Sequence, residues 1–170
     1  IMGLIRERKF VATVEATVQE TVPEYSAAVM KERYKVIGSF STTATSNQNR
    51  NNNISLAMNA LDGLVIFPGE EFSFNKTTGN RTKERGYMPA GAYRDGKLVE
   101  EPGGGVCQVS STLYNALIFS GIQITERNPH SYEPSYVTPG EDAMVSYDGY
   151  SGPDLRFVNT QDTSVAIRAV

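Results

Sequence analysis

Apolar side chains recur at helical spacing in two stretches of the chain. The first follows an asparagine-rich run at residues 49–53 and is expected to end at Asp62-Gly63. The second begins near Cys107 and is expected to end at Gly121. Each stretch predicts an amphipathic helix. The defining positions are Ile54, Met58, Leu61 and Val65 in the first, and Val109, Leu113, Ala116 and Leu117 in the second.

Short runs of alternating apolar and polar residues predict strands. Asp95-Gly96 predicts a hairpin between residues 86–93 and 97–99, and a short helix is expected at residues 25–34. The other predicted strands cover residues 8–22, 36–40, 64–67, 72–74, 122–125, 143–147, 155–158 and 164–170. This order indicates an α+β fold, with a mixed or antiparallel sheet packed on a central helix that carries the cysteine.

Length and composition limit the classes of protein that fit. The 170 residues, 39% hydrophobic and 21% charged, suit one ordinary globular domain. The stronger patterns begin at about Val36, so residues 1–35 are expected to be the tail of a preceding module or a linker, and residues 36–170 the main domain. A net charge of −3 without a basic block argues against nucleic acid as a partner. No apolar run approaches the roughly 20 residues of a membrane span, so we expect a soluble fragment cut from a longer protein.

The chain holds one cysteine and one histidine. A single cysteine excludes an internal disulfide, and a structural zinc site would lack thiolate and imidazole ligands. We therefore expect neither a metal nor another cofactor.

Three glycines, at positions 103–105, lead directly into Cys107. A cysteine in a helix is most often a small buried hydrophobe. Three consecutive glycines are entropically costly, however, and indicate positive φ angles or a close approach by other parts of the chain. At a helix start, unpaired N–H groups and the helix dipole favour a thiolate, and the amides of Gly104 and Gly105 could receive an oxyanion. This pattern predicts a nucleophile.

His130 follows Cys107 by 23 positions, with acidic residues beyond it. This order fits a thiol nucleophile, a base and a group that orients the base. For the orienting group we rank Asp142 above Asp154. The alternative is a surface histidine, and aspartates that serve a strand entry or a turn. A cysteine at a helix start followed by a histidine also resembles the papain-like and transglutaminase-like layout.

Two polar clusters have competing interpretations. The asparagines near the first helix are good N-caps, which leaves Arg50 and Asn53 as weaker site candidates. Arg81, Glu84 and Arg85 form either a solvated face or a carboxylate-binding group.

Seven blocks of residues carry a resemblance to a known family. They are Phe72-Ser73-Phe74-Asn75, Gly79-Asn80-Arg81-Thr82, Gly86-Tyr87, residues 103–115, His130-Ser131 with Tyr136-Val137, Gly140-Glu141-Asp142-Ala143, and residues 154–159. From about Phe40 to Val170 the chain resembles the VanW family. Residues 1–35 resemble the end of a peptidoglycan-binding-like module.

The resemblance implies an extracytoplasmic cell-envelope protein of Gram-positive bacteria, with a parent protein that is often membrane-anchored. The family is named for an accessory protein of vancomycin-resistance clusters. Some members have been assigned L,D-transpeptidase activity, with the cysteine as nucleophile. Carried over, Cys107 attacks the carbonyl of the third residue of a peptidoglycan stem peptide and expels the terminal D-alanine. His130 as base and Asp142 as the third catalytic member come from the residue order described above. A second stem then resolves the thioester to give a 3–3 cross-link.

The expected partners are peptidoglycan stem peptides. We predict substrate contacts from the arginines Arg81, Arg85 and Arg127, and from Tyr87, Gly104, Gly105, Gln108, Ser110 and Ser111. Two alternatives stay open: a cysteine peptidase that uses water in place of the acceptor amine, and a non-catalytic module that binds stem peptides or a glycopeptide.

Overall fold

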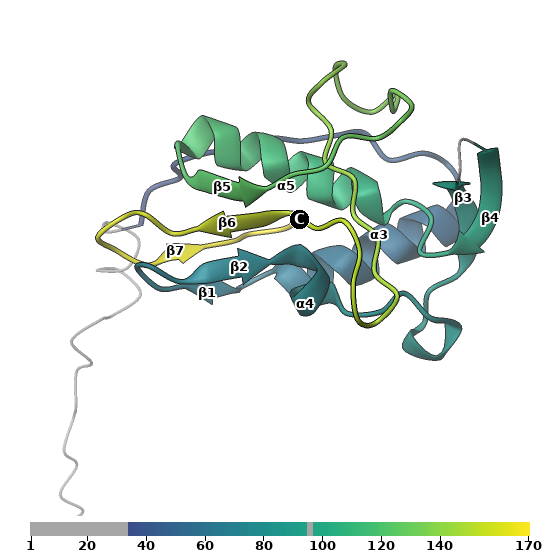
Figure 1. Cartoon of the computed structure of the whole chain (residues 1–170), viewed down its shortest axis with the longest axis horizontal. Coiled ribbons are helices and arrows are strands. Elements are labelled where there is room, and N and C mark those ends of the chain that lie inside the picture. Colours follow the sequence, from purple (N-terminus) through teal and green to yellow (C-terminus); the bar gives the residue numbers. More distant parts are fainter. Residues whose placement is uncertain (1–33, 95–96) are drawn as a thin grey trace, which may run out of the picture. The chain divides into compact units, whose positions relative to one another are not determined.

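The computed structural model describes residues 34–94 and 97–170 (Figure 1). Contacts divide the chain into two units, residues 1–35 and residues 36–170, and the second unit is described here. The strand predicted at 8–22 and almost all of the helix predicted at 25–34 lie outside the described residues, as does the Asp95-Gly96 turn.

Both amphipathic stretches form helices. Helix α3 spans Gln48–Leu61, and its N-cap Asn47 accepts a hydrogen bond from the backbone of Arg50. Helix α5 spans Val106–Ser120 and ends at Gly121, which has a φ of 71°. The apolar periodicity therefore predicted both helices and the residues at which they stop. The start of α3 differs, because the asparagine run at 49–53 lies inside the helix and the cap is Asn47. Within the described residues, no helix is both long and apolar enough to cross a membrane.

The strands are short and pair in antiparallel fashion. Strands β2 (Glu71–Ser73), β6 (Arg156–Val158) and β5 (Gln123–Glu126) form a sheet in the order β2-β6-β5. Strand β1 (Val65–Ile66) pairs with β7 (Val165–Ala166), and β3 (Pro89–Arg94) pairs with β4 (Lys97–Pro102). Helix α4 (Phe74–Thr78) and a 3₁₀ turn (Lys83–Arg85) lie between β2 and β3. The predicted α+β class, with antiparallel pairing, is confirmed.

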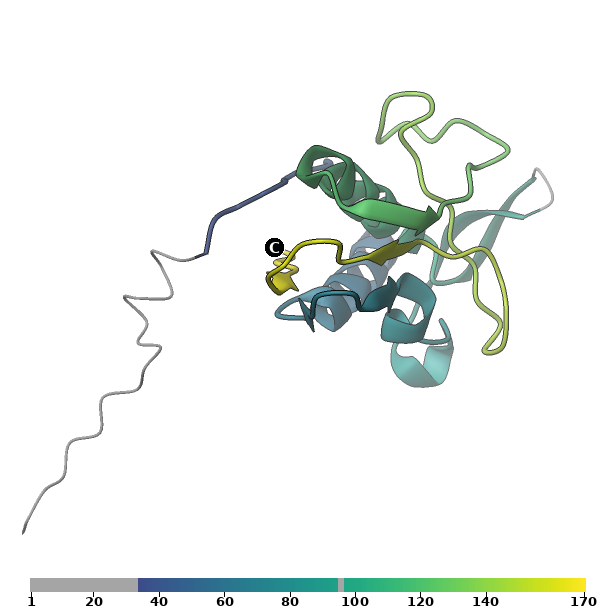
Figure 2. The ribbon, with the colours of Figure 1, turned by 60° about the vertical axis from the view of Figure 1, so that its left-hand side comes forward.

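One apolar core joins the helices to the sheet. Helices α3 and α5 lie behind the strands in the view of Figure 1, and Figure 2 shows the same elements from the side. The largest buried side chains include Phe72 and Phe157, whose rings stack at 4.7 Å. Leu61 of α3 and Leu117 of α5 belong to the same cluster. The core therefore fixes α5, which carries Cys107, against the sheet.

Two predicted strands are wrong. Residues 36–40 are not a strand. Instead, Gly38 lies so close to α5 that a Cβ there would be 2.2 Å from the Ala116 carbonyl oxygen, and Phe40 stacks on Phe119. Residues 143–147 are also not a strand, because their backbone bonds to side chains of α5 and to loops. The alternation of apolar and polar residues is the same whether a segment packs against a helix in this way or pairs with a neighbouring strand.

The third difference is helix α4, which the sequence did not predict. The run 72–74 alternates, but only its first part belongs to β2. Ser73 then caps α4 by accepting a hydrogen bond from the backbone of Lys76.

Candidate functional site

Cys107 is the second residue of α5 and is partly exposed. Its Sγ lies 3.3 Å from the carbonyl oxygen of Val145. The preceding Gly105 is the N-cap, in a left-handed conformation with a φ of 106°. The sulfur therefore lies at the positive end of a fifteen-residue helix, which is the position that the sequence predicted.

Each of the three glycines is required by a close neighbour. A Cβ on Gly103 would lie 2.7 Å from Cβ of Arg81, and one on Gly105 would lie 2.7 Å from Cγ of Arg50. A Cβ on Gly104 would lie 2.2 Å from the carbonyl oxygen of Ala90 in β3. The glycine run thus accommodates two arginine side chains and one strand backbone, as the expected close approach required.

Two amides at this helix start are available to an anion. The N–H groups of Gly105 and Cys107 have no acceptor among the residues that the structure describes. In contrast, Gly104 N–H donates to the carbonyl of Glu101 at 3.2 Å. The predicted oxyanion donors are therefore revised: Gly105 stays, Cys107 joins it, and the Gly104 amide is already used.

His130 and Asp142 form a close pair beside this helix start. Oδ2 of Asp142 lies 2.6 Å from Nδ1 of His130 and also accepts the His130 backbone N–H at 2.6 Å. Their side chains are 11% and 6% exposed. This geometry leaves Nε2 of the ring unused by Asp142, and Cys107 lies near enough to the ring to affect its pKa. The structure thus brings together Cys107, His130 and Asp142.

Arg127 holds Asp142 from the other side. Its Nη2 donates to Asp142 Oδ1 at 3.0 Å, and its Nε donates to the backbone carbonyl of Asp142 at 2.7 Å. The guanidinium also lies over the ring of Tyr114, 5.2 Å from the centroid. Arg127 is therefore placed to position a carboxylate of the protein itself.

Serines of α5 attach the segment that carries Asp142. Ser111 accepts a hydrogen bond from the Ala143 backbone N–H at 2.9 Å, and Ser110 donates to the Ala143 carbonyl at 2.6 Å. Asn115 donates to the carbonyl of Glu141. Both serines are fully buried. The polar side of α5 thus connects Asp142 to the helix that carries Cys107.

The contact between His130 and Asp142 changes the pKa values of both side chains. Burial of the His130 ring disfavours its charge, but the hydrogen bond and charge of Cys107, followed by those of Asp142, raise the pKa of His130 above its ordinary value. Burial works to raise the pKa of Asp142, yet hydrogen bonds from the backbone and ring of His130 outweigh it and lower that pKa. Both shifts favour an ionic pair.

Cys107 and His130 line a cavity of about 840 Å³. The predicted residues Arg81, Gln108, Gly104 and Gly105 also line it. The lining also includes hairpin residues of β3 and β4 and the segment that follows β5, to which His130 belongs. The structure does not place the remaining predicted contacts in the lining: Tyr87, Arg85, Ser110, Ser111 and Arg127.

Two lining residues were missed or underrated by the sequence. Arg50 donates from Nη2 to Oε1 of Gln108 at 3.0 Å, and its guanidinium lies over the ring of Tyr136, 5.9 Å from the centroid. Burial raises the pKa of Tyr136, and so does the charge of Cys107. Its phenol therefore stays protonated and can donate. Tyr136 appeared only within a family motif, and its loop position gave no chemical signal.

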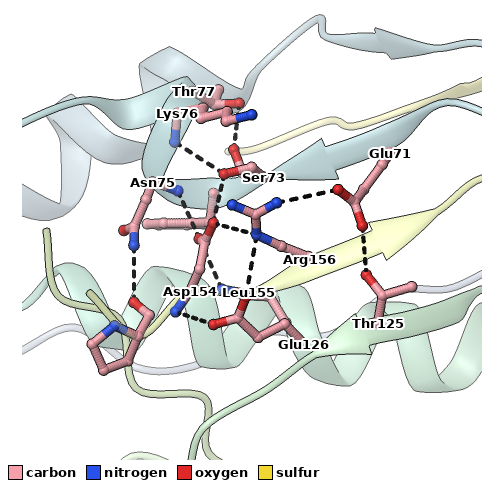
Figure 3. Close-up of polar contacts among 12 residues, drawn as sticks. Glu71, Ser73, Asn75, Lys76, Thr77, Thr125, Glu126, Asp154, Leu155 and Arg156 are labelled. Atoms are coloured by element: carbon pink, nitrogen blue, oxygen red, sulfur yellow. Dashed lines mark hydrogen bonds and ion pairs between the residues drawn. The ribbon is translucent and has the colours of Figure 1, made fainter. Parts of the chain in front are cut away.

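Asp154, the second-ranked carboxylate, has a different place. It is buried and accepts hydrogen bonds from the Ser73 hydroxyl, the Asn75 backbone and Arg156 Nε (Figure 3). Arg156 also pairs with Glu71 and Glu126. This network ties β2, α4, β5 and β6 together. Asp154 therefore stabilises the sheet and makes no contact with His130.

A metal centre has no evident ligand set in the described part of the chain. Across residues 34–94 and 97–170, no three histidine, cysteine, aspartate or glutamate side chains are grouped so as to hold an ion.

Comparisons with known proteins agree with the resemblance in the sequence. The family model described as VanW like protein matches residues 49–170. YoaR, an uncharacterised protein of Bacillus subtilis strain 168, is 48% identical over 125 residues, covering 74% of this chain and 40% of YoaR. The vancomycin B-type resistance protein VanW of Enterococcus faecalis V583 is 30% identical over 123 residues, covering 71% of this chain and 44% of that protein. The chain thus spans less than half the length of these relatives, and no solved structure matches it. The chain belongs to the VanW-like family.

Proposed function

We propose that this domain is a cysteine acyl-transferase acting on peptidoglycan stem peptides, of the L,D-transpeptidase type. The observation that carries the proposal is that Cys107 and the Asp142-bound His130 line the same cavity, which is large enough for a peptide. The family relationship, and the name of the Enterococcus relative, support a role connected with vancomycin resistance. The proposed location is the cell envelope, on a membrane-anchored parent.

The first half-reaction forms a thioester. His130 takes the Cys107 thiol proton on Nε2, because Asp142 keeps the Nδ1 proton directed toward its carboxylate. The sulfur attacks the carbonyl of the third stem residue, and the developing oxyanion lies near the amides of Gly105 and Cys107. The carbon–nitrogen bond then breaks. His130 returns its proton to the leaving amine, and the terminal amino acid departs.

The second half-reaction transfers the acyl group. An amine of a second stem peptide gives a proton to His130 and attacks the thioester carbonyl. A new amide bond forms, the carbon–sulfur bond breaks, and Cys107 regains its proton. The product is a 3–3 cross-link and the enzyme returns to its starting state. The papain-like or transglutaminase-like layout belongs to this proposal, supported by the cysteine at a helix start and the histidine that follows it.

The test is cross-link formation from tetrapeptide-bearing muropeptides, followed by mass analysis of dimers. Wild-type protein is expected to produce dimers and a transient acyl-enzyme of matching mass. Cys107→Ala is expected to produce neither while retaining wild-type thermal unfolding. Dimer formation by Cys107→Ala at the wild-type rate would refute the proposal. Cleaved stems without dimers would indicate a peptidase, and binding without cleavage would indicate a recognition module.

A further inference from the structure

Two arginines flank the glycine run beside Cys107. Arg50 comes from α3 and packs its stem on Gly105, whereas Arg81 comes from the loop after α4 and packs on Gly103. Both arginines line the cavity that holds Cys107 and His130. Gly103 and Gly105 have no side chains, which leaves room for the two arginine stems next to the segment that carries Cys107.

Neither guanidinium is neutralised by the protein. In the described residues, neither Arg50 nor Arg81 forms an ion pair, whereas Arg127 and Arg156 both do. Arg81 Nη2 donates instead to the neutral oxygens of Asn75 and Thr78. Nε of Arg50 and Nη1 of Arg81 are buried and have no hydrogen-bond partner within the described ranges. Buried charge without a counter-charge is unfavourable unless a ligand supplies one.

Burial also disfavours the charge of Arg81. Desolvation lowers the pKa of Arg81 below its ordinary value, although Tyr87 and Cys107 in their ionised forms, and to a smaller extent the carboxylate of Asp154, oppose that shift. Two aromatic rings, those of Phe74 and Tyr147, lie against the guanidinium, each centroid 5.9 Å from Cζ. These rings attract the guanidinium and help to hold it, but neither supplies a formal negative charge. A carboxylate-bearing ligand could therefore still pair with Arg81.

We propose that Arg50 and Arg81 form a recognition site for the free C-terminal carboxylate of the residue that leaves during acyl transfer. Guanidinium groups match planar carboxylates through paired hydrogen bonds. Consecutive residues are about 3.8 Å apart along the chain, so a carboxylate bound beside the attacked carbonyl belongs to the very next residue. The substrate class is thus a peptide cleaved one residue from its free C-terminus.

This inference rests on the proposed function for its substrate, but the site can be tested without turnover. Iodoacetate and iodoacetamide alkylate a thiol by the same displacement, in which the sulfur–carbon bond forms and iodide leaves. They differ in that only iodoacetate carries a carboxylate. The ratio of their rates cancels the reactivity of the sulfur and reports on the surrounding charge. The expected ratio for wild type is at least about tenfold above that of a free peptide thiol.

Substitutions test whether the preference for iodoacetate depends on Arg50 and Arg81. Arg50→Gln is expected to lower the iodoacetate-to-iodoacetamide ratio about tenfold, and Arg50→Lys to restore part of it. Arg81→Lys tests the second position with its charge retained, since Arg81→Gln also removes the hydrogen bonds to Asn75 and Thr78. Arg168→Gln is the matched control, because Arg168 is exposed, lies outside the cavity lining and undergoes the same change in charge. An unchanged ratio in Arg50→Gln, or an equal loss in Arg168→Gln, would overturn the proposal.

A second measurement uses paired donor peptides that end in a free carboxylate or in a carboxamide. Wild type is expected to favour the acid in kcat/KM by at least about tenfold, and Arg50→Gln is expected to lower this acid-to-amide ratio toward one, whatever its effect on the amide donor itself. If Cys107 proves dispensable for turnover but the alkylation ratio depends on Arg50, the carboxylate site stands without the proposed activity. The opposite outcome is that turnover requires Cys107, while Arg50→Gln changes neither the iodoacetate-to-iodoacetamide ratio nor the acid-to-amide ratio. In that case the proposed activity stands and the carboxylate site is refuted.

Discussion

A single oxygen of Asp142, Oδ2, lies 2.6 Å from both the backbone nitrogen and the Nδ1 atom of His130. Two contacts to one residue fix the ring more tightly than a side-chain contact alone, because the backbone contact removes the freedom of the loop. The second oxygen of Asp142 is held by Arg127. The imidazole therefore has one orientation, with Nε2 left for Cys107.

Replacing Asp142 by asparagine should weaken the interaction that holds the His130 ring. An amide carries no charge, so the pKa of His130 is expected to fall, and acyl transfer is expected to drop by roughly 10² to 10⁴. Titration of the imidazole by NMR and a rate assay measure the two effects. Asp162→Asn, at an exposed position, serves as control. A His130 titration unchanged in Asp142→Asn would contradict the proposed pairing.

Folding stability should depend on the protonation of His130. Its pKa is raised in the folded protein, so its contribution is fully present below its ordinary value of 6.5 and is lost as pH rises through the folded pKa. The difference in free energy of unfolding between wild type and His130→Gln is therefore expected to shrink as the pH rises from 6.5 through the raised pKa of His130. Denaturant titrations at several pH values measure it. A difference that grows with pH would show the opposite sign of coupling.

The carboxylate of Asp142 gives the opposite dependence in acid. Its pKa is lowered by His130 and Arg127, so this contribution is present above the ordinary value of 3.8 and is lost as pH falls through the folded pKa. Asp142→Asn is therefore expected to be less stable than wild type near neutral pH and to approach it in acid. An equal difference in free energy of unfolding between wild type and Asp142→Asn at neutral and acidic pH would contradict this expectation.

Arg127 should influence the rate rather than the binding of substrate. It contacts Asp142 and Tyr114 and does not line the cavity. Arg127→Gln is expected to lower kcat by roughly 10- to 100-fold while KM and the preference for a free carboxylate stay unchanged. Steady-state kinetics on acid and amide donors separate the two effects. A raised KM for the acid donor alone would instead place Arg127 at the substrate.

The glycine run offers a comparison between strain alone and strain with a clash. Gly105→Ala would place a Cβ 2.7 Å from Arg50 at a φ of 106°, whereas Gly121→Ala, at a φ of 71°, meets no atom within 4 Å. Both should lose stability, Gly121→Ala by about 1 kcal/mol and Gly105→Ala by about 2 to 4 kcal/mol. Only Gly105→Ala should also lose the iodoacetate preference. Thermal unfolding and the alkylation ratio measure both effects.

Asn53 is expected to be structural. It is fully buried, donates to the carbonyls of Met88 and Gly104, and accepts from the Met88 backbone N–H. Asn53→Ala leaves three backbone groups unpaired and is expected to cost about 3 to 5 kcal/mol. The control Asn52→Ala loses a contact with the Gly86 carbonyl at an exposed site and should cost less than about 1 kcal/mol. Equal losses would contradict the assignment.

The sequence by itself determined the elements that depend on local spacing. Helices α3 and α5, the residues at which they stop, the antiparallel α+β class and the need for glycine before Cys107 all follow from periodicity and steric limits. The chemistry of the residue types also made Cys107, His130 and Asp142 candidates. Each of these signals is either a short local pattern or the type of a single residue, so no tertiary information is needed to detect it.

Only the tertiary structure decided which candidates meet. The segment with Asp142 binds the serines of α5 through its backbone, and no pattern in residues 141–147 distinguishes those bonds from a strand ladder. Long-range packing likewise places Asp154 in a hydrogen-bond network within the sheet. It also brings Arg127 into an ion pair with Asp142. The same packing brought Arg50, from a helix more than fifty positions earlier, beside the nucleophile. Such contacts depend on how the elements dock in the core, which local spacing does not specify.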